Sequence, residues 1–291
     1  MRFPRHSFFI VFLLFSSVLL YDHLRELLYF STKSNVYSYI PLIPVVTIFL
    51  LYSDRKAIFS DPGYGFVYGG AVLIAALTVS IISRRNLLDL TMDYRLSLAS
   101  LAIVSAWVGG FVLCYGIRAF KIALFPLLFL LFMVPFPDSI LDVVIAGLQE
   151  GSFMVTVWIF KIMGVKIYTS GFVISLPLPR FDIEVAKECS GIRSSMSLFI
   201  TSLLIGRFFL SSPINKCILA LTVIPIAVFK NAVRIVFISL GALYLDEEFI
   251  SGPLHHKGGV LFFILGLLLL ALIARLLRAR ERLDALPNGP S

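Results

Sequence analysis

The sequence has few charged residues and no long polar segment. Only 14% of its 291 residues are Asp, Glu, Lys or Arg, whereas 59% are hydrophobic, and the mean hydropathy is +0.95. This composition excludes a soluble globular protein, because a soluble domain of this size has no need for so much apolar surface. It also argues against nucleic acid as a partner. The net charge is +8, but the aromatic residues lie within apolar runs instead of on a basic surface.

Cysteine and histidine are also scarce, with three and four residues respectively. Cys114, Cys189 and Cys217 are odd in number and widely spaced, which argues against a disulfide framework and against a zinc site. Nothing in the sequence resembles a nucleotide-binding loop, so we expect no cofactor and no metal. Cys114 and Cys217 lie in or beside apolar runs, as is typical of inert packing residues.

Apolar runs occupy most of the chain. Runs of about 17–25 apolar residues are long enough to cross a bilayer as helices. The sequence therefore predicts an all-α polytopic membrane protein with about eight transmembrane helices. The expected spans are residues 7–30, 37–52, 65–83, 96–117, 119–135, 192–210, 217–243 and 258–277. No small-residue cleavage site follows the first run, so we expect a retained helix and not a signal peptide.

The region between the fifth and sixth expected spans is different. Pro135 and Pro137 end a helix. Residues 138–164 are long enough to span but unusually polar, so we predict a helix that lies in the interface or re-enters the membrane. Residues 165–185 alternate between polar and apolar side chains, and a turn interrupts them near Gly171. This pattern predicts a small β-meander outside the bilayer core.

Basic residues set the expected orientation, because cytoplasmic loops are enriched in Lys and Arg. With the N-terminus inside, both termini are cytoplasmic, and the β-meander lies outside a plasma (inner) membrane. The residues then placed in the cytoplasm are Arg2, Arg5, Arg55, Lys56, Arg118, Lys121, Arg207, Lys216, Arg275, Arg278, Arg280 and Arg282. Arg84, Arg85 and Arg95 break the rule.

We expect one integral membrane domain over residues 1–291, with four parts. These are the N-terminal helices (7–135), the interfacial helix and β-region (136–188), the helices that carry the candidate site (189–277) and a basic cytoplasmic tail (278–291).

Cys189 is the first candidate for chemistry. The Cys189-Ser190-Gly191 step stands at the start of a membrane helix, where the helix dipole and free N–H groups lower the pKa of a thiol. The small neighbours also let a substrate backbone approach closely. A buried structural cysteine is the alternative interpretation. Arg193, one turn further on, either supports the site or anchors the helix.

Arg234 is the second candidate. It lies inside an apolar helix, where a charge costs about 2.5–3.5 kcal/mol. Asn231, three residues earlier, shares its helical face, and together they offer several donors to an oxyanion or a carboxylate. We expect Lys230 to point elsewhere and to reach the outer interface. In the alternative interpretation, Arg234 forms a structural ion pair with Glu184 or Glu188.

His255 and His256 form the third candidate. Histidine is the side chain best suited to take a proton from a thiol near neutral pH. An interfacial histidine pair without a role is one alternative. A metal site is a weaker one, because no carboxylate or cysteine lies at ligand spacing. With eight spans, Cys189, Arg234 and His255 reach the same outer face. A Cys–His pair with a donor for the oxyanion is the usual apparatus for acyl transfer.

These motifs resemble the exosortase/archaeosortase family of membrane transpeptidases. The resemblance covers most of the C-terminal half: residues 125–135, 185–193 and 231–235, and the His255-x-x-x-Gly259 step. It implies that Cys189 is the nucleophile, Arg234 the substrate or oxyanion clamp, and His255 the acid/base. The histidine doublet leaves the choice between His255 and His256 open. The residues expected to support the site are Asn231, Arg193, His256 and Glu188.

The resemblance also implies a substrate. The substrates of the family are secreted proteins that end in a short motif, one membrane helix and basic residues. The enzyme would cut near the motif and pass the acyl group to a surface acceptor, which stays open between water, an amine, a lipid and a glycan. In bacteria the family is often linked to exopolysaccharide production. We keep two alternatives: a transporter in which Arg234, Asp138, Asp142 and Glu150 line a polar pathway, and a non-catalytic component of a polysaccharide export system.

Overall fold

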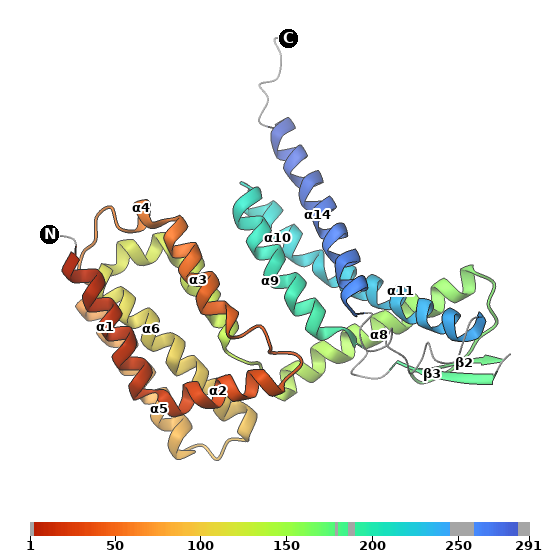
Figure 1. Ribbon diagram of the computed structural model, residues 1–291, viewed down its shortest axis with the longest axis horizontal. Coiled ribbons are helices and arrows are strands. Elements are labelled where there is room, and N and C mark those ends of the chain that lie inside the picture. Colours follow the sequence, from red (N-terminus) through yellow and green to blue (C-terminus); the bar gives the residue numbers. More distant parts are fainter. Residues whose placement is uncertain (1–2, 178–179, 186–189, 245–258, 285–291) are drawn as a thin grey trace, which may run out of the picture. The chain divides into compact units, whose positions relative to one another are not determined.

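A computed structural model describes residues 3–177, 180–185, 190–244 and 259–284 (Figure 1). The chain forms two compact units, Met1–Leu141 and Asp142–Ser291. In the first unit the helices are α1 (Phe3–Leu19), α2 (Tyr21–Lys33), α3 (Leu42–Ser53), α4 (Arg55–Ile58), α5 (Phe66–Arg85), α6 (Met92–Ile122), α7 (Leu124–Phe129) and the 3-10 helix η1 (Leu130–Met133). Helix α8 (Asp138–Ile162) begins in the first unit and ends in the second.

Helix α6 is the centre of the first unit. It packs against α1, α2, α4, α5, α7 and η1. In the most apolar 18-residue stretch of α6, 61% of the residues are buried, whereas only 22% are buried in the corresponding stretch of α5. Most of the surface of α5 therefore faces the surroundings of the protein. Gly65 and Gly69, four residues apart, let α5 approach α6 closely, as small residues do in membrane helix pairs. A Cβ atom at Gly69 would lie only 2.6 Å from the backbone nitrogen of Leu113.

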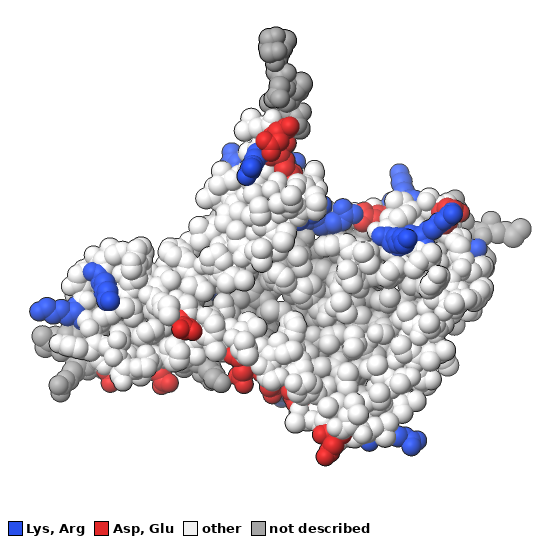
Figure 2. All heavy atoms as spheres, turned by 180° about the vertical axis from the view of Figure 1, so that it is seen from behind, with Lys and Arg blue, Asp and Glu red and all other residues white. Residues whose placement is uncertain are grey.

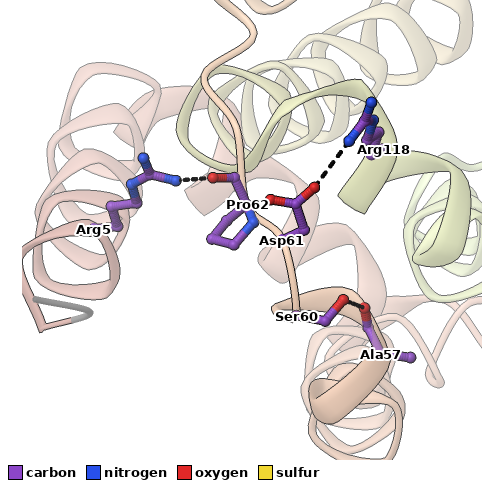
Figure 3. A network of polar contacts seen from close by, with 6 residues as sticks. All are labelled: Arg5, Ala57, Ser60, Asp61, Pro62 and Arg118. Carbon is purple, nitrogen blue, oxygen red and sulfur yellow. Dashed lines mark hydrogen bonds and ion pairs between the residues drawn. The ribbon is translucent and has the colours of Figure 1, made fainter.

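Polar contacts tie together the loops at one end of the first unit (Figure 3). The Arg5 guanidinium on α1 donates a hydrogen bond to the carbonyl of Pro62. Arg118 near the end of α6 forms an ion pair of 2.9 Å with Asp61. The Ser60 hydroxyl donates to the carbonyl of Ala57 at 2.9 Å and closes the turn after α4. The start of α1, the α4–α5 loop and the last turns of α6 therefore share one end.

A second set of contacts lies at the opposite ends of α5 and α6. The buried Tyr37 hydroxyl donates to the carbonyl of Phe136 at 3.1 Å and accepts a hydrogen bond from the Phe136 amide at 3.0 Å. Arg84 at the end of α5 pairs with Asp22 on α2 at 2.7 Å. Arg84 is one of the three basic residues that break the charge rule, and this partner offsets its charge.

The number of membrane spans differs from the expected eight or so. Among the described residues, six helices are long and apolar enough to cross a membrane, and a seventh span results if the pair Arg5–Leu19 and Tyr21–Lys33, bent by 78°, counts as one. Residues 37–52 and 119–135 form only the shorter apolar helices Leu42–Ser53 and Leu124–Met133. Hydropathy overestimated the length of both helices. Pro41 directly precedes the helix that begins at Leu42, and α6 continues to Ile122 before the helix at Leu124 begins.

Helix α8 is a candidate span in a region where the sequence predicted an interfacial or re-entrant helix. It is continuous over 25 residues and meets the same requirements of length and hydropathy. The polarity that favoured an interfacial helix has a different explanation. Gln149, Ser152 and Thr156 are buried on one face of α8, at the spacing of successive helical turns. Their polar groups bond to protein, so they do not oppose a position inside the membrane.

The second unit contains the rest of α8, a small sheet and the C-terminal helices. The sheet is antiparallel in the order β1 (Tyr168–Ser170), β2 (Val173–Pro177), β3 (Arg180–Glu184). It confirms the β-meander expected from residues 165–185. The helices are α9 (Ile192–Phe209), α10 (Pro213–Leu221), α11 (Val223–Tyr244) and α14 (Gly259–Asp284). One apolar cluster joins the sheet to α8 and α11 through Phe160, Ile174, Val185, Ile235 and Val236.

The four C-terminal helices form a bundle with a second apolar cluster, built on Leu198, Leu219, Ile226 and Leu270. At one end of the bundle the Glu281 carboxylate accepts hydrogen bonds of 2.9 Å from the Ser211 amide, the Ser212 amide and the Asn215 side chain. Glu281 thereby caps the N-terminus of α10. Because α9 ends and α10 begins here, the start of α9 lies at the far end of the bundle from this cap.

Large apolar side chains remain exposed on the helices. Examples are Val67, Trp158, Ile224 and Leu268, each more than half exposed. The face drawn in Figure 2 is covered mostly by uncharged side chains. Apolar surface of this extent is stable against lipid and not against water. Together with the long apolar helices, it identifies an integral membrane protein.

The contact between α5 and α6 yields a testable prediction. Gly69→Ala places a methyl group 2.6–2.7 Å from the Leu113 backbone, so the two helices must move apart. We expect a loss of about 1–3 kcal/mol of stability, measured as a lower thermal unfolding midpoint in detergent micelles. Gly70→Ala is the matched control, because a Cβ atom there meets nothing within 4 Å. Equal midpoints for the two variants would contradict the close packing.

Candidate functional site

The structure describes three of the seven residues predicted for the site. Asn231 and Arg234 lie on α11 and Arg193 lies in the first turn of α9. Cys189, Glu188, His255 and His256 lie outside the described residues. The site can therefore be built from the two residues that directly follow Cys189 in the chain, Ser190 and Gly191, and from the side chains around them.

The turn at Gly191 begins α9. Gly191 has φ +72°, a conformation that residues with a Cβ atom rarely adopt. Its carbonyl accepts hydrogen bonds from the Ser195 amide at 3.0 Å and from the hydroxyls of Ser194 and Ser195 at 2.9 Å each. The turn that follows Cys189 is thus fixed by the first helical turn of α9.

Lys230 contacts this turn from α11. Its side chain is only 3% exposed, and Nζ donates a hydrogen bond of 2.5 Å to the Ser194 hydroxyl. A Cβ atom at Gly191 would lie 3.3 Å from Nζ. The expectation that Lys230 points away and reaches the outer interface is therefore wrong. The physical reason is that α11 continues to Tyr244, so the ammonium lies inside the bundle and finds a hydroxyl there.

Asn231 contacts the same turn. A Cβ atom at Gly191 would lie 3.3 Å from Asn231 Oδ1, and Asn231 Nδ2 donates to the Ser152 hydroxyl on α8 at 3.1 Å. Asn231 and Ser152 are both buried. On α8, one turn before Ser152, Gln149 donates a hydrogen bond to the carbonyl of Val185 after β3. Asn231 therefore brings the α9 turn and α8 together on α11, and Gln149 ties the end of β3 to α8.

Arg234 is partly buried one turn beyond Lys230, and Arg193 is exposed. Residues four apart are neighbours on a helix surface, so α11 carries two cations side by side. No carboxylate among the described residues forms an ion pair with Lys230. The N-terminus of α9 adds the positive end of its dipole. This surrounding favours an anion: a thiolate, an oxyanion or a carboxylate.

Ser190 is a further polar group at the turn. Its side chain is 1% exposed, and its hydroxyl has no hydrogen-bond partner within the described part of the chain. The hydroxyl is thus available to donate to a group that enters the turn. The described residues contain no cluster of His, Cys, Asp and Glu that could hold a metal ion.

Sequence reasoning missed Lys230, Ser194 and Ser152. Lys230 shows the same sequence feature as Arg234, a charged residue inside an apolar helix. We interpreted it differently, because a lysine in such a helix can extend its side chain to the membrane interface. Ser152 was detectable as one of the polar residues at helical spacing on α8, together with Gln149 and Thr156. Ser194 had no signal of its own, because serine is common in membrane helices.

The Gly191 turn can be tested by adding a Cβ atom. Gly191→Ala introduces backbone strain of about 1–2 kcal/mol and also brings a methyl group 3.3 Å from both Asn231 Oδ1 and Lys230 Nζ. Gly164→Ala is the matched control, because Gly164 has the same φ of +72° and nothing within 4 Å. We expect Gly191→Ala to destabilise the protein by about 1 kcal/mol more than Gly164→Ala in detergent unfolding. The same loss in both variants would show that α11 does not press on the turn.

Comparison with known proteins identifies the chain. The family model for transmembrane exosortases matches residues 31–272, which include most of the first unit and nearly all of the membrane helices of the second. The comparisons with curated proteins and with solved structures gave no significant match. The family match agrees with the resemblance carried by the cysteine, asparagine–arginine and histidine motifs. The chain therefore belongs to the transmembrane exosortase family.

Proposed function

We propose that the protein is a cysteine transpeptidase or protease of the extracytoplasmic membrane face, and that it cleaves the C-terminal sorting signals of secreted proteins. Family membership already indicates a membrane transpeptidase or protease. One observation supports the finer assignment. The turn that directly follows Cys189 is in contact with Asn231 and Lys230 of α11, one helical turn from Arg234. The chain thus brings the cysteine motif to the helix that carries the arginine.

The proposed reaction begins with Cys189. Its thiolate attacks the scissile carbonyl carbon, and Arg234 donates hydrogen bonds to the oxyanion that forms. The C–N bond then breaks, and His255 transfers a proton to the leaving amine. The product is a thioester between Cys189 and the new C-terminus of the substrate. Attack by water or by an acceptor amine or hydroxyl on the thioester carbonyl releases the acyl group and returns the thiol.

The substrate would be presented by the membrane itself. A secreted protein that ends in a short motif, one membrane helix and basic residues can lie against the exposed apolar helices, with its motif at the outer interface. With six spans in this orientation, both termini of the enzyme are cytoplasmic. A lipid or polysaccharide acceptor at the cell surface would connect the reaction to exopolysaccharide production, and membrane lipid surrounds the enzyme throughout.

The transporter alternative finds less support. Its polar pathway required Asp138, Asp142 and Glu150 together with Arg234. All three acidic side chains are exposed on α8, whereas the buried polar residues of that helix are Gln149, Ser152 and Thr156. The interior side chains of Thr156 and Asn231 both bond to Ser152, as in a fixed site rather than an open path.

The nucleophile is tested by co-expression with a secreted reporter that carries a C-terminal motif, a membrane helix and a basic end. We expect wild-type protein to shorten the reporter on an immunoblot and Cys189→Ala to leave it intact at equal abundance. Cys217→Ala is the matched control, because Cys217 is an exposed cysteine of the same unit. Processing by Cys189→Ala at the wild-type rate would refute the thioester mechanism.

The histidine doublet gives a separate prediction. General acid–base catalysis contributes about 10²–10⁴-fold to a rate. We therefore expect His255→Ala to slow processing by about that factor, and His256→Ala to change it by less than about tenfold. Both rates are measured by pulse-chase of the same reporter. The reverse ranking would move the acid/base role to His256.

A further inference from the structure

We propose that a groove between α10 and α14 binds the headgroup of a phospholipid with a primary ammonium, phosphatidylethanolamine. The groove has a volume of about 590 Å³, which is within the range of about 300–1,000 Å³ that is usual for small-molecule sites. Its lining includes Ser211 and Ser212, which connect α9 to α10. It therefore lies at the far end of the bundle from the Gly191 turn, and the inference does not depend on the proposed function.

One wall of the groove is apolar. Ile214 and Ile218 line it from α10, and Leu221 follows them at helical spacing. On α14, Leu276 lies one turn before Arg280, and all four apolar side chains are exposed. Acyl chains pack favourably against such a surface, whereas a free phosphate gains nothing from it. The apolar wall therefore favours a lipid over a small water-soluble anion.

The charges on the α14 side of the groove suit a zwitterion. Arg280 Nε lies 3.9 Å from an Asp284 carboxylate oxygen, which is too far for a hydrogen bond, and the two side chains are 74% and 73% exposed. An ion pair of this kind contributes little. The guanidinium can thus donate to a phosphate oxygen, and the carboxylate can accept from an ammonium. Figure 2 shows acidic and basic side chains together near the C-terminal end of α14.

Glu281, the third charged residue of the lining, already has partners in the protein. Its carboxylate accepts the hydrogen bonds from the Ser211 and Ser212 amides and from the Asn215 side chain, each 2.9 Å long. Glu281 therefore holds the α9–α10 connection in place, and Asp284 is the carboxylate left to bind a cation. One available cation and one available anion suit a zwitterionic headgroup better than an anionic one.

The lining also favours a primary ammonium over a quaternary one. A primary ammonium has three N–H donors, which can serve the Asp284 carboxylate and the hydroxyls of Ser211 and Ser212. A quaternary ammonium has no donor and is recognised through aromatic faces. Among the described residues that line the groove, none is aromatic. We therefore expect phosphatidylethanolamine to bind more tightly than phosphatidylcholine.

The experiment measures lipid binding to the full-length protein in detergent by native mass spectrometry. Phosphatidylethanolamine, phosphatidylcholine and phosphatidylglycerol with identical acyl chains are titrated separately. We expect the first to bind about fivefold more tightly than either of the others, because two exposed polar contacts distinguish them.

Two variants separate the contacts. Asp284→Asn removes the partner of the ammonium, so we expect the affinity for phosphatidylethanolamine to fall to that for phosphatidylcholine. Arg280→Gln removes the partner of the phosphate, so we expect it to weaken the binding of both lipids alike. Asp61→Asn and Arg118→Gln are the matched controls, because they remove the charges of an exposed ion pair in the first unit. Neither control should change the order or the strength of lipid binding.

Equal binding of the three lipids to wild-type protein would overturn the proposal. Tighter binding of phosphatidylglycerol would also overturn it, because the protein would then respond to the net charge of the lipid. The same holds for an undiminished preference for phosphatidylethanolamine in Asp284→Asn, once its thermal unfolding midpoint shows that the variant is folded.

Discussion

The hydrogen bonds that satisfy polar groups inside an apolar bundle are the constraint on which the second unit depends. An unpaired polar group costs several kcal/mol in the hydrocarbon region. The bundle satisfies this requirement in pairs: Gln149 with the Val185 carbonyl, Asn231 with Ser152, and Lys230 with Ser194. Each pair joins two different segments of the chain. The hydrogen bonds that offset the cost of burying these polar groups therefore also hold α8, the end of β3, α9 and α11 around the Gly191 turn.

These hydrogen bonds between helices require a close approach of the helices, and glycine residues make that approach possible. Gly191 brings α9 against Lys230 and Asn231, and Gly266 makes room on α14 for the lysine stem. Gly151 on α8 faces Val228 on α11, where a Cβ atom would lie 3.0 Å from a methyl carbon. Helices in a membrane associate through such close packing rather than through hydrophobic burial. The glycines and the polar pairs are therefore two parts of one arrangement.

The sequence predicted the elements that hydropathy and alternation encode. The spans near residues 65–83, 96–117, 192–210, 217–243 and 258–277 are all helices of spanning length, and the β-meander lies within the residues expected for it. It failed where the outcome depends on tertiary contacts. Nothing local shows that α6 extends to Ile122, or that Gln149 and Ser152 face protein and not lipid. Hydropathy alone assigned the spans at 37–52 and 119–135, and polarity alone assigned residues 138–164 to an interfacial or re-entrant helix.

The same distinction applies to the candidate site. Composition and spacing identified Cys189, Arg234, Asn231 and the histidines as types of residue that do chemistry in membranes. The direction of Lys230 was not encoded locally, because a lysine in an apolar helix can either snorkel to the interface or turn inward. The contacts of Gly191 and Gly266 decide between these alternatives. The role of a glycine in helix packing depends on its neighbours on other helices, which the sequence alone does not show.

The two cations of α11 suit different steps of the proposed reaction. The Lys230 ammonium, held by Ser194, places a charge at the Gly191 turn before any substrate arrives. The oxyanion exists only after attack, and catalysis requires a group that binds it more strongly than it binds the ground state. A guanidinium offers several directional donors for that purpose. Lys230 and Arg234, four residues apart on one helix, would thus divide the holding of the Gly191 turn from the stabilisation of the transition state.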